Sequence, residues 1–181
     1  YIRNYQGFYP DGLQNNYRYR MLAFQEWRQL HRAGKLNAAQ QQFFRPRPAE
    51  QLFDIDNDPH QVRNLSADPV HRKTLLDLRR RLRHKQLAIN DLSLYPESHQ
   101  VSQILDDPIG FGTRHHDEMK VLHRIADLAL NPPASALPSL KDHLASKNPW
   151  HRYWACLAAS AIGPSACPLV PALINRLDDS H

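Results

Sequence analysis

Three groups of acidic residues have spacings that could suit a cation site. They are Asp54, Asp56 and Asp58; Asp106 and Asp107; and Asp178 and Asp179. The first group alternates along the chain as the first ligands of an EF-hand calcium loop do. An EF-hand needs glycine at loop position six and glutamate at position twelve, whereas this sequence has Pro59 and Leu65 there. We therefore interpret all three groups as turn and capping residues and assign no metal ligands.

Histidine and cysteine residues are the other candidates for metal binding or nucleophilic chemistry. His115, His116 and His123 lie around Asp117, but no closed set of zinc ligands surrounds them. We interpret this region as the solvated start of a helix. Two cysteines cannot form a disulfide framework, and we expect both to be small buried apolar residues.

Basic residues outnumber acidic ones, which gives the 181-residue chain a formal net charge of +5. Their densest run is RRRLRHK, residues 79–85. A basic helix can follow the phosphates of a nucleic acid, but no aromatic residues alternate with these arginines to stack on bases. We interpret the run as a solvated helix face and expect no nucleic-acid binding.

The elements of the first half can be predicted from local patterns. YIRNY, residues 1–5, predicts a strand, and the helical spacing of apolar residues over 19–33 predicts a helix that ends at Gly34. Residues 35–44 predict a second helix with Asn37 as its cap. RPRPAE, residues 45–50, breaks that helix and favours extended chain.

The stretch EQLFDIDNDPHQVRNLSADP, residues 50–69, predicts a strand, a turn and a helix in quick succession. QLFDI alternates as a half-buried strand does, and it includes Phe53. Asp58 with Pro59 predicts a helix opening, and Asp68 with Pro69 repeats that signal. A long amphipathic helix then follows over residues 70–89, with a narrow apolar stripe of Leu75, Leu78, Leu82 and Ile89.

In this order, AEQLFDIDNDPHQVRNLSADPVHRKTLLDLRRRL resembles the C-terminal signature of the sulfatases, within the alkaline-phosphatase-like superfamily. In those enzymes a strand ending in Glu-Leu-Tyr-Asp precedes an Asp-Pro turn, an Asn-Leu pair and a closing helix. The matching positions are Gln51-Leu52-Phe53-Asp54, Asp58-Pro59, Asn64-Leu65 and Asp68-Pro69. Gln51 and Phe53 depart from the pattern but keep strand character. The resemblance covers residues 1–97 and implies a small sheet closed by a helix.

Sulfatases convert the Cys or Ser of Cys/Ser-x-Pro-x-Arg to formylglycine and hold a divalent cation, commonly calcium, with acidic residues. Neither Cys156, Cys167 nor any serine of this chain lies in that motif. The resemblance therefore implies that the catalytic domain, with its formylglycine and calcium, lies upstream. This segment alone would hold no cofactor and no catalytic residue. Because loops of the C-terminal part border the cleft in that family, the resemblance implies Arg3, Asn4 and Tyr17 as contacts to a sulfated substrate.

The second half has a different pattern. Residues 98–116 carry turn signals and predict a linker. Beyond it, ALPSLKDHLASKNP and LVPALINRLDDSH align at a spacing of 33 residues, which indicates a helical repeat. NPWHRYWACLAASAIG resembles the first helix of a HEAT-like unit, with Arg152 and Ala155 at its usual positions and Gly163 as its end.

Together these patterns predict an α+β protein: a small antiparallel sheet with a packed closing helix (residues 1–97), a linker (98–116) and all-α HEAT-like repeats (117–181). We expect the C-terminal part of a bacterial sulfatase that completes the fold and borders the substrate cleft. The alternative is a non-catalytic helical-repeat interaction protein with a polyanion as ligand. The N-terminus has no signal-peptide pattern, and we expect a piece of a longer protein. Its localisation does not follow from this segment; it would be periplasmic or secreted if the parent is a typical bacterial sulfatase. No apolar run approaches 20 residues, so we expect no membrane span.

Overall fold

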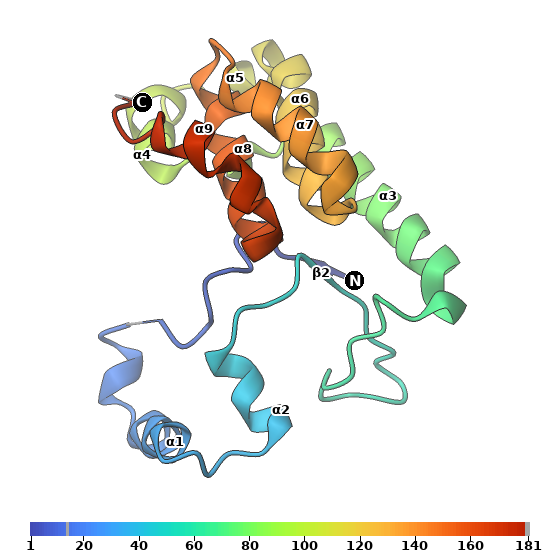
Figure 1. Cartoon of the computed structure of the whole chain (residues 1–181), viewed down its shortest axis with the longest axis vertical. Helices are drawn as coiled ribbons and strands as arrows, with labels where there is room; N and C mark the ends of the chain where they lie inside the picture. The colour runs from blue at the N-terminus through green and yellow to red at the C-terminus, as the bar shows by residue number, and fades with distance from the viewer. Residues whose placement is uncertain (14, 180–181) are drawn as a thin grey trace.

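The computed structural model describes residues 1–13 and 15–179, which form a mainly helical molecule with a small antiparallel sheet (Figure 1). The strands are β1 (Ile2–Arg3) and β2 (Glu50–Gln51). The helices are α1 (Leu22–Arg32), α2 (Ala38–Gln41), α3 (Arg72–Ala88), α4 (Glu97–His99), α5 (Pro108–Arg114), α6 (His116–Asp127), α7 (Pro133–Leu144), α8 (Pro149–Ile162) and α9 (Val170–Ile174). This composition agrees with the predicted α+β class.

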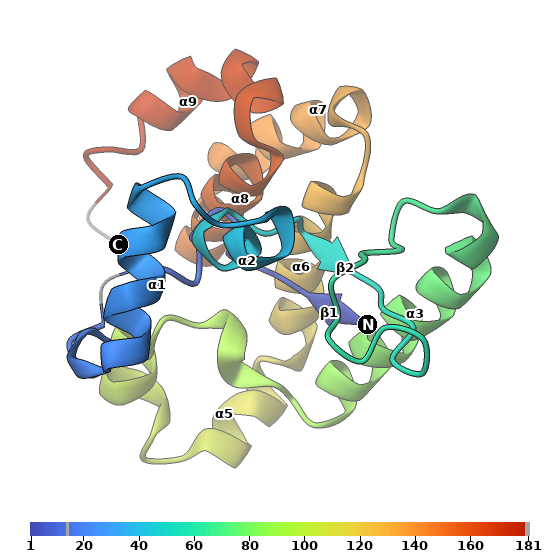
Figure 2. The same cartoon turned by 90° about the horizontal axis from the view of Figure 1, so that it is seen from below.

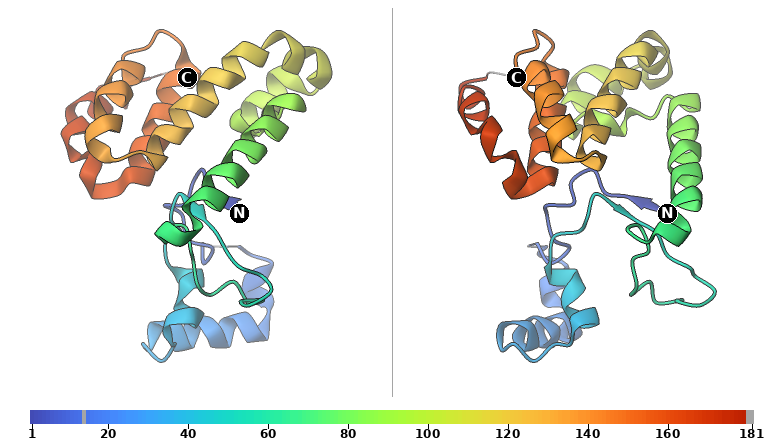
Figure 3. Two further views of the ribbon diagram at one scale, coloured as in Figure 1. Left: turned by 90° about the vertical axis from the view of Figure 1, so that its right-hand side faces the viewer. Right: turned by 45° about the vertical axis from the view of Figure 1, so that its right-hand side comes forward.

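The molecule has a helical end and a smaller end, joined by the sheet. Helices α6, α7 and α8 pack together with α9 and α3 beside them, whereas α1 and α2 lie at the opposite end (Figures 1 and 3). Two extended segments connect the ends and carry β1 and β2, which lie side by side in the view from below (Figure 2). The sheet thus lies where the two ends of the molecule meet.

The sheet is shorter than the sequence predicts. Ile2 pairs with Gln51 and Arg3 with Glu50, but Phe53 lies outside the ladder. The reason is that the backbone of Leu52 bonds elsewhere: its amide donates to Asn64 Oδ1 at 2.9 Å, and its carbonyl accepts from the Leu65 amide at 2.8 Å. Once these groups are satisfied, they cannot extend the pairing with β1.

Of the two Asp-Pro signals, only the second opens a helix. The Asp58 carboxylate accepts the Arg63 amide at 2.8 Å and closes a turn, in which Gln61 has a φ of 54°. The helix predicted at Asp58 is therefore absent. Asp68 accepts the Val70 amide at 3.0 Å and caps the 3₁₀ turn (Pro69–His71) that leads into α3, as predicted.

Ion pairs attach α3 to its neighbours. Arg79 donates to both carboxylate oxygens of Glu50 in β2, at 3.0 and 2.5 Å, and Arg83 pairs with Asp127 in α6. The interpretation of residues 79–85 as a solvated face is therefore wrong for these two arginines. It holds for Arg80, whose side chain is 73% exposed.

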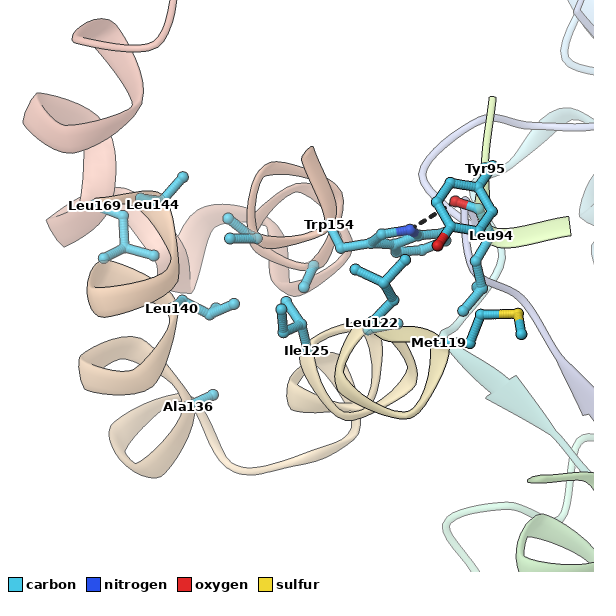
Figure 4. Close-up of a cluster of buried hydrophobic side chains, with 14 of the residues drawn as sticks. Leu94, Tyr95, Met119, Leu122, Ile125, Ala136, Leu140, Leu144, Trp154 and Leu169 are labelled. Carbon is cyan, nitrogen blue, oxygen red and sulfur yellow. Dashed lines mark hydrogen bonds between the residues drawn. The ribbon is translucent and has the colours of Figure 1, made fainter. Parts of the chain in front are cut away.

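The main core lies between α6, α7 and α8 (Figure 4). Trp154 lies beside Leu122 and Leu94 at one side of this core, and its indole Nε1 donates to the Leu94 carbonyl at 2.8 Å. Ile104 and Phe111 are also buried in this core, although they belong to the predicted linker. The linker range is largely helical, since it contains a π-helical turn (Gln100–Ile104) and α5. Asp107 caps α5 by accepting the Gly110 amide at 2.9 Å.

The predicted repeat region, residues 117–181, forms nearly all of α6, then α7, α8 and the short α9. Gly163 ends α8 with a φ of 71°, at the predicted stop. By length and composition alone, the stretch Pro149–Ile174 could cross a membrane, whereas the sequence pattern predicts no membrane span. Gly163 divides this stretch, and the buried face of α8 packs on α6 and α7. The HEAT-like repeat, the domain division and the absence of a membrane span remain predictions.

Candidate functional site

A hollow of about 400 Å³ lies beside the sheet, on the side of the turn that follows α2. Its lining includes Arg45, Arg47, Gln51, Asn64 and Asp11. A neighbouring hollow of about 370 Å³ is lined by Arg18, Tyr9 and others, and it shares Asp11 and Arg47 with the first. We call the two together the arginine-lined hollow.

An aromatic cluster positions one wall of the arginine-lined hollow. Trp27 of α1 stacks on Phe43 with ring centroids 4.6 Å apart, and the buried Phe24 lies edge-on to Phe43 at 6.0 Å. Asn37 caps α2 in a capping box with Gln40, as predicted. These contacts fix the point at which the chain leaves α2 and enters the Arg-Pro-Arg-Pro segment.

The Arg-Pro-Arg-Pro segment lies against the N-terminal loop. The Arg47 amide donates to the Gly7 carbonyl at 2.7 Å. A Cβ atom on Gly7 would lie only 2.4 Å from the Arg47 carbonyl oxygen, so glycine permits this close approach. Prolines on both sides of Arg47 restrict the backbone to extended conformations. Arg45 and Arg47 therefore both line the hollow.

Positively charged side chains outnumber negatively charged ones in the arginine-lined hollow. Arg47 Nη2 lies 3.4 Å from Asp11 Oδ1, and both side chains remain about two-fifths exposed. Arg18 bonds to the Asp11 carbonyl and Arg45 to the Gln41 side chain. Of these three guanidinium groups, that of Arg47 pairs with a carboxylate, whereas those of Arg18 and Arg45 bond neutral acceptors. Guanidinium groups bind sulfate and carboxylate groups through paired hydrogen bonds, so this site is suited to an anion.

The three residues predicted to contact substrate do not lie together in the hollow. The Arg3 side chain is 3% exposed and pairs with Asp127 at 3.3 Å. Asn4 is buried and donates to Gln51 Oε1 at 2.8 Å, so it supports a residue that lines the hollow. Tyr17 is 81% exposed and is not among the lining residues. Substrate contact by these residues remains a prediction.

Arg3 belongs to a buried polar cluster between the sheet and the helices. Asp127 accepts from Arg3 and Arg83, and the Tyr5 hydroxyl lies 3.4 Å from His123 Nδ1. The His123 side chain is fully buried, and burial lowers its pKa from 6.5 to about 4. The interpretation of His123 as part of a solvated helix start is therefore wrong.

The acidic groups have local roles in the structure. Asp54 accepts from the Asn57 side chain at 2.8 Å, which is the main cause of its lowered pKa. Asp107 caps α5, and Asp179 pairs with Arg152 in α8. Across residues 1–13 and 15–179, no three His, Cys, Asp or Glu side chains converge as a metal site requires.

The cysteines differ in exposure. Cys156 is half-buried, and burial raises the pKa of its thiol. Cys167 is exposed, which corrects the expectation that both are buried. The Cys156 thiol therefore lacks the lowered pKa that activates a cysteine nucleophile.

The sequence patterns did not predict the charged residues that line the hollow. The sequence patterns place Arg45 and Arg47 only in a helix-breaking segment, and they predict no role for Asp11 and Arg18. The available signal was the alternation of arginine and proline, because proline holds the chain extended and keeps the intervening side chains apart.

Comparison with known proteins relates part of the chain to a sulfatase. The ulvan-active sulfatase of Formosa agariphila is 40% identical over 108 residues, which cover 58% of this chain and 18% of that protein. The chain thus spans less than a fifth of this relative. No family model matches the chain. No solved structure matches it either. The predicted relationship of a segment to the sulfatases is confirmed.

Proposed function

We propose that this chain is the C-terminal part of a sulfatase, a sulfuric ester hydrolase. The observation that carries the proposal is the 40% identity over 108 residues to the ulvan-active sulfatase, of which only 18% is covered. The formylglycine motif is missing from the 181 residues. The catalytic domain, with formylglycine and calcium, would therefore lie upstream, in a periplasmic or secreted bacterial enzyme of the alkaline-phosphatase-like superfamily.

The segment would complete the fold and border the substrate cleft. The guanidinium groups of Arg18, Arg45 and Arg47 support this role, because a sulfated polysaccharide carries anionic groups along its length. Binding energy from such remote groups helps to position the sulfate ester at the reacting centre. The arginine-lined hollow would then hold a part of the substrate that does not react.

Turnover by the longest natural polypeptide tests the catalytic proposal. We expect it to hydrolyse a chromogenic aryl sulfate, whereas residues 1–181 alone give no turnover. Ulvan is the polysaccharide to try first, since the relative is named for activity on it. A natural polypeptide without a Cys/Ser-x-Pro-x-Arg domain, and without sulfate release, would contradict the proposal.

Substitution of Arg47 by Gln in the natural polypeptide tests the substrate contact. Loss of one charged hydrogen-bonding partner should lower kcat/KM for a sulfated polysaccharide by about tenfold. A small aryl sulfate cannot reach from the reacting centre to the arginine-lined hollow, so its kcat/KM should stay unchanged. The matched control is Arg80→Gln, because the Arg80 side chain is exposed on α3 outside the hollow. Equal losses on both substrates would argue against this role.

The second candidate is a non-catalytic helical-repeat protein that binds a polyanion. It is favoured by the main core, which is built from α6, α7 and α8 rather than from the sheet. The same arginines would attract any polyanion. Salt-dependent binding of sulfated polymers by a natural polypeptide that has no hydrolase domain would favour this candidate.

A further inference from the structure

A separate hollow of about 480 Å³ lies where α4 and α5 meet the first turns of α6 and α8. It is lined by His99, Gln103, Phe111, His115, Glu118, Asn148, Pro149 and Trp150. We call it the aromatic hollow. None of its residues lines the arginine-lined hollow, and no role has been assigned to it above.

Aromatic rings fix the walls of the aromatic hollow. His99 and Trp150 have centroids 4.4 Å apart, and Phe111 stacks on His115 at 3.8 Å with an interplanar angle of 15°. The buried Tyr95 lies edge-on to Trp150 at 5.6 Å and to Phe111 at 5.4 Å. Packing against Tyr95 holds the rings in place, so the hollow is preformed.

The carboxylate of Glu118 is held in this hollow by neutral donors. The Tyr95 hydroxyl donates to Glu118 Oε2 and the Asn148 amide to Oε1, each at 2.7 Å. In the described part of the chain, no Lys, Arg or His nitrogen lies within ion-pair distance of this carboxylate. Other partly buried acids, such as Glu50 and Asp127, have arginine partners. Glu118 is therefore a fixed, half-buried negative charge that lacks a counter-ion.

We infer that the aromatic hollow binds a small organic cation of the alkylammonium class. An ammonium group is attracted by the face of an indole ring and by a carboxylate, and this hollow offers Trp150 and Glu118 together. A sulfated or carboxylated sugar would be repelled by Glu118. A single carboxylate is too few ligands for a divalent metal ion. Burial lowers the pKa of His99, which disfavours a positive charge on this imidazole beside the ligand.

Choline and its neutral isostere, in which a tert-butyl group replaces the trimethylammonium group, test the inference on the unmodified chain. The two probes have the same shape, so a difference in affinity reports the charge. Isothermal titration calorimetry near pH 7 should show choline binding about tenfold more tightly than the isostere. Equal affinities, or no choline binding at millimolar concentration, would overturn the inference. Tighter binding of a neutral monosaccharide than of choline would also overturn it.

Two variants locate the site. Trp150→Leu and Glu118→Gln should each weaken choline binding by about fivefold to tenfold, because each removes one of the two attractions. Glu97→Gln is the matched control, since Glu97 is an exposed carboxylate of α4 that does not line the hollow. Thermal unfolding checks that each variant is folded. If a variant is not folded, the comparison of choline with its isostere on the unmodified chain still tests the inference. Unchanged affinity in both folded variants would refute this site.

Phosphatidylcholine vesicles distinguish two sources of the cation. If the chain sediments with vesicles and soluble choline releases it, the ligand is a lipid headgroup. If it binds choline but not vesicles, the ligand is a free compound. Either result supports the inference.

Discussion

The guanidinium of Arg3 holds the sheet against α6, because it pairs with Asp127 and donates to the Ala126 carbonyl at 2.7 Å. On its other side it donates to the Ala49 carbonyl at 2.8 Å, next to β2. One side chain therefore joins three segments that are distant in sequence. At the residue scale, the contacts of Arg3 fix the position of the sheet relative to α6.

Replacing Arg3 by Met should destabilise the protein by about 3 kcal/mol, because it leaves Asp127 with Arg83 as its remaining arginine partner and removes three hydrogen bonds from the guanidinium to backbone carbonyls. Urea unfolding measures the free energy. Arg80→Met is the control and should change it by less than about 0.5 kcal/mol, since Arg80 is exposed. Equal effects of the two substitutions would show that the Arg3 contacts do not stabilise the fold.

His123 makes the stability of the protein depend on pH. Its pKa is about 4 in the folded state, against an ordinary value of 6.5, because burial disfavours the charged imidazole. Between these values the unfolded state binds more protons, so the free energy of unfolding falls as pH falls from 6.5 towards 4. The full difference corresponds to roughly 3 kcal/mol. The contribution of the neutral His123 imidazole to the free energy of unfolding is fully present above pH 6.5.

Urea unfolding at a series of pH values measures this dependence. His123→Gln should flatten the curve between pH 4 and 6.5, whereas His84→Gln should not, because His84 is exposed on α3. If both variants keep the slope of the original protein, another group causes the acid sensitivity.

At the element scale, the Asn64-Leu65 pair ends the sheet. The Asn64 carboxamide accepts the amide of the buried Leu52, and Leu65 packs with Leu52 and Leu75 of α3 in a small second core. The turn after β2 therefore holds the closing helix as well as terminating the strand. This explains why a short sheet suffices to position α3.

Asn64→Ala should lower the free energy of unfolding by about 1–3 kcal/mol, because the Leu52 amide would be buried without an acceptor. Hydrogen exchange at that amide should quicken. Asn57→Ala, in the exposed turn, is the control and should have an effect below about 0.5 kcal/mol. No change in exchange at Leu52 would mean that the backbone finds another acceptor.

At the scale of the whole molecule, the predicted domain boundary at residue 97 crosses a continuous core. Tyr5 lies edge-on to Trp154 at 5.6 Å, and Leu94 accepts the indole hydrogen bond of the same residue. Arg83 of α3 forms an ion pair with Asp127 of α6. The first 97 residues thus share both apolar and charged contacts with the helices that follow.

Residues 1–97 expressed alone should therefore fail to fold cooperatively, because their own apolar cluster is small and their arginines lose Asp127. Near-ultraviolet circular dichroism and urea unfolding measure this, with the chain of residues 1–181 as the control. A sharp unfolding transition of the shorter chain would instead support independent domains as predicted.

The sequence by itself determined the features whose causes are local. Asn37 and Asp68 cap the turns of their own segments, Gly34 and Gly163 adopt the positive φ that ends a helix, and the order of short motifs indicated the sulfatases. In each case the interacting groups lie within a few residues, so a linear pattern contains the physical cause.

Only the tertiary structure decided which charged and polar groups meet. Arg3 and Asp127 are 124 positions apart, and no local pattern links them. The burial of His123, the ion pairs of Arg79 and Arg83, and the linings of both hollows arise in the same way. Because the energy of such groups depends on desolvation and on partners brought together by folding, the same side chain is solvated in one fold and buried in another.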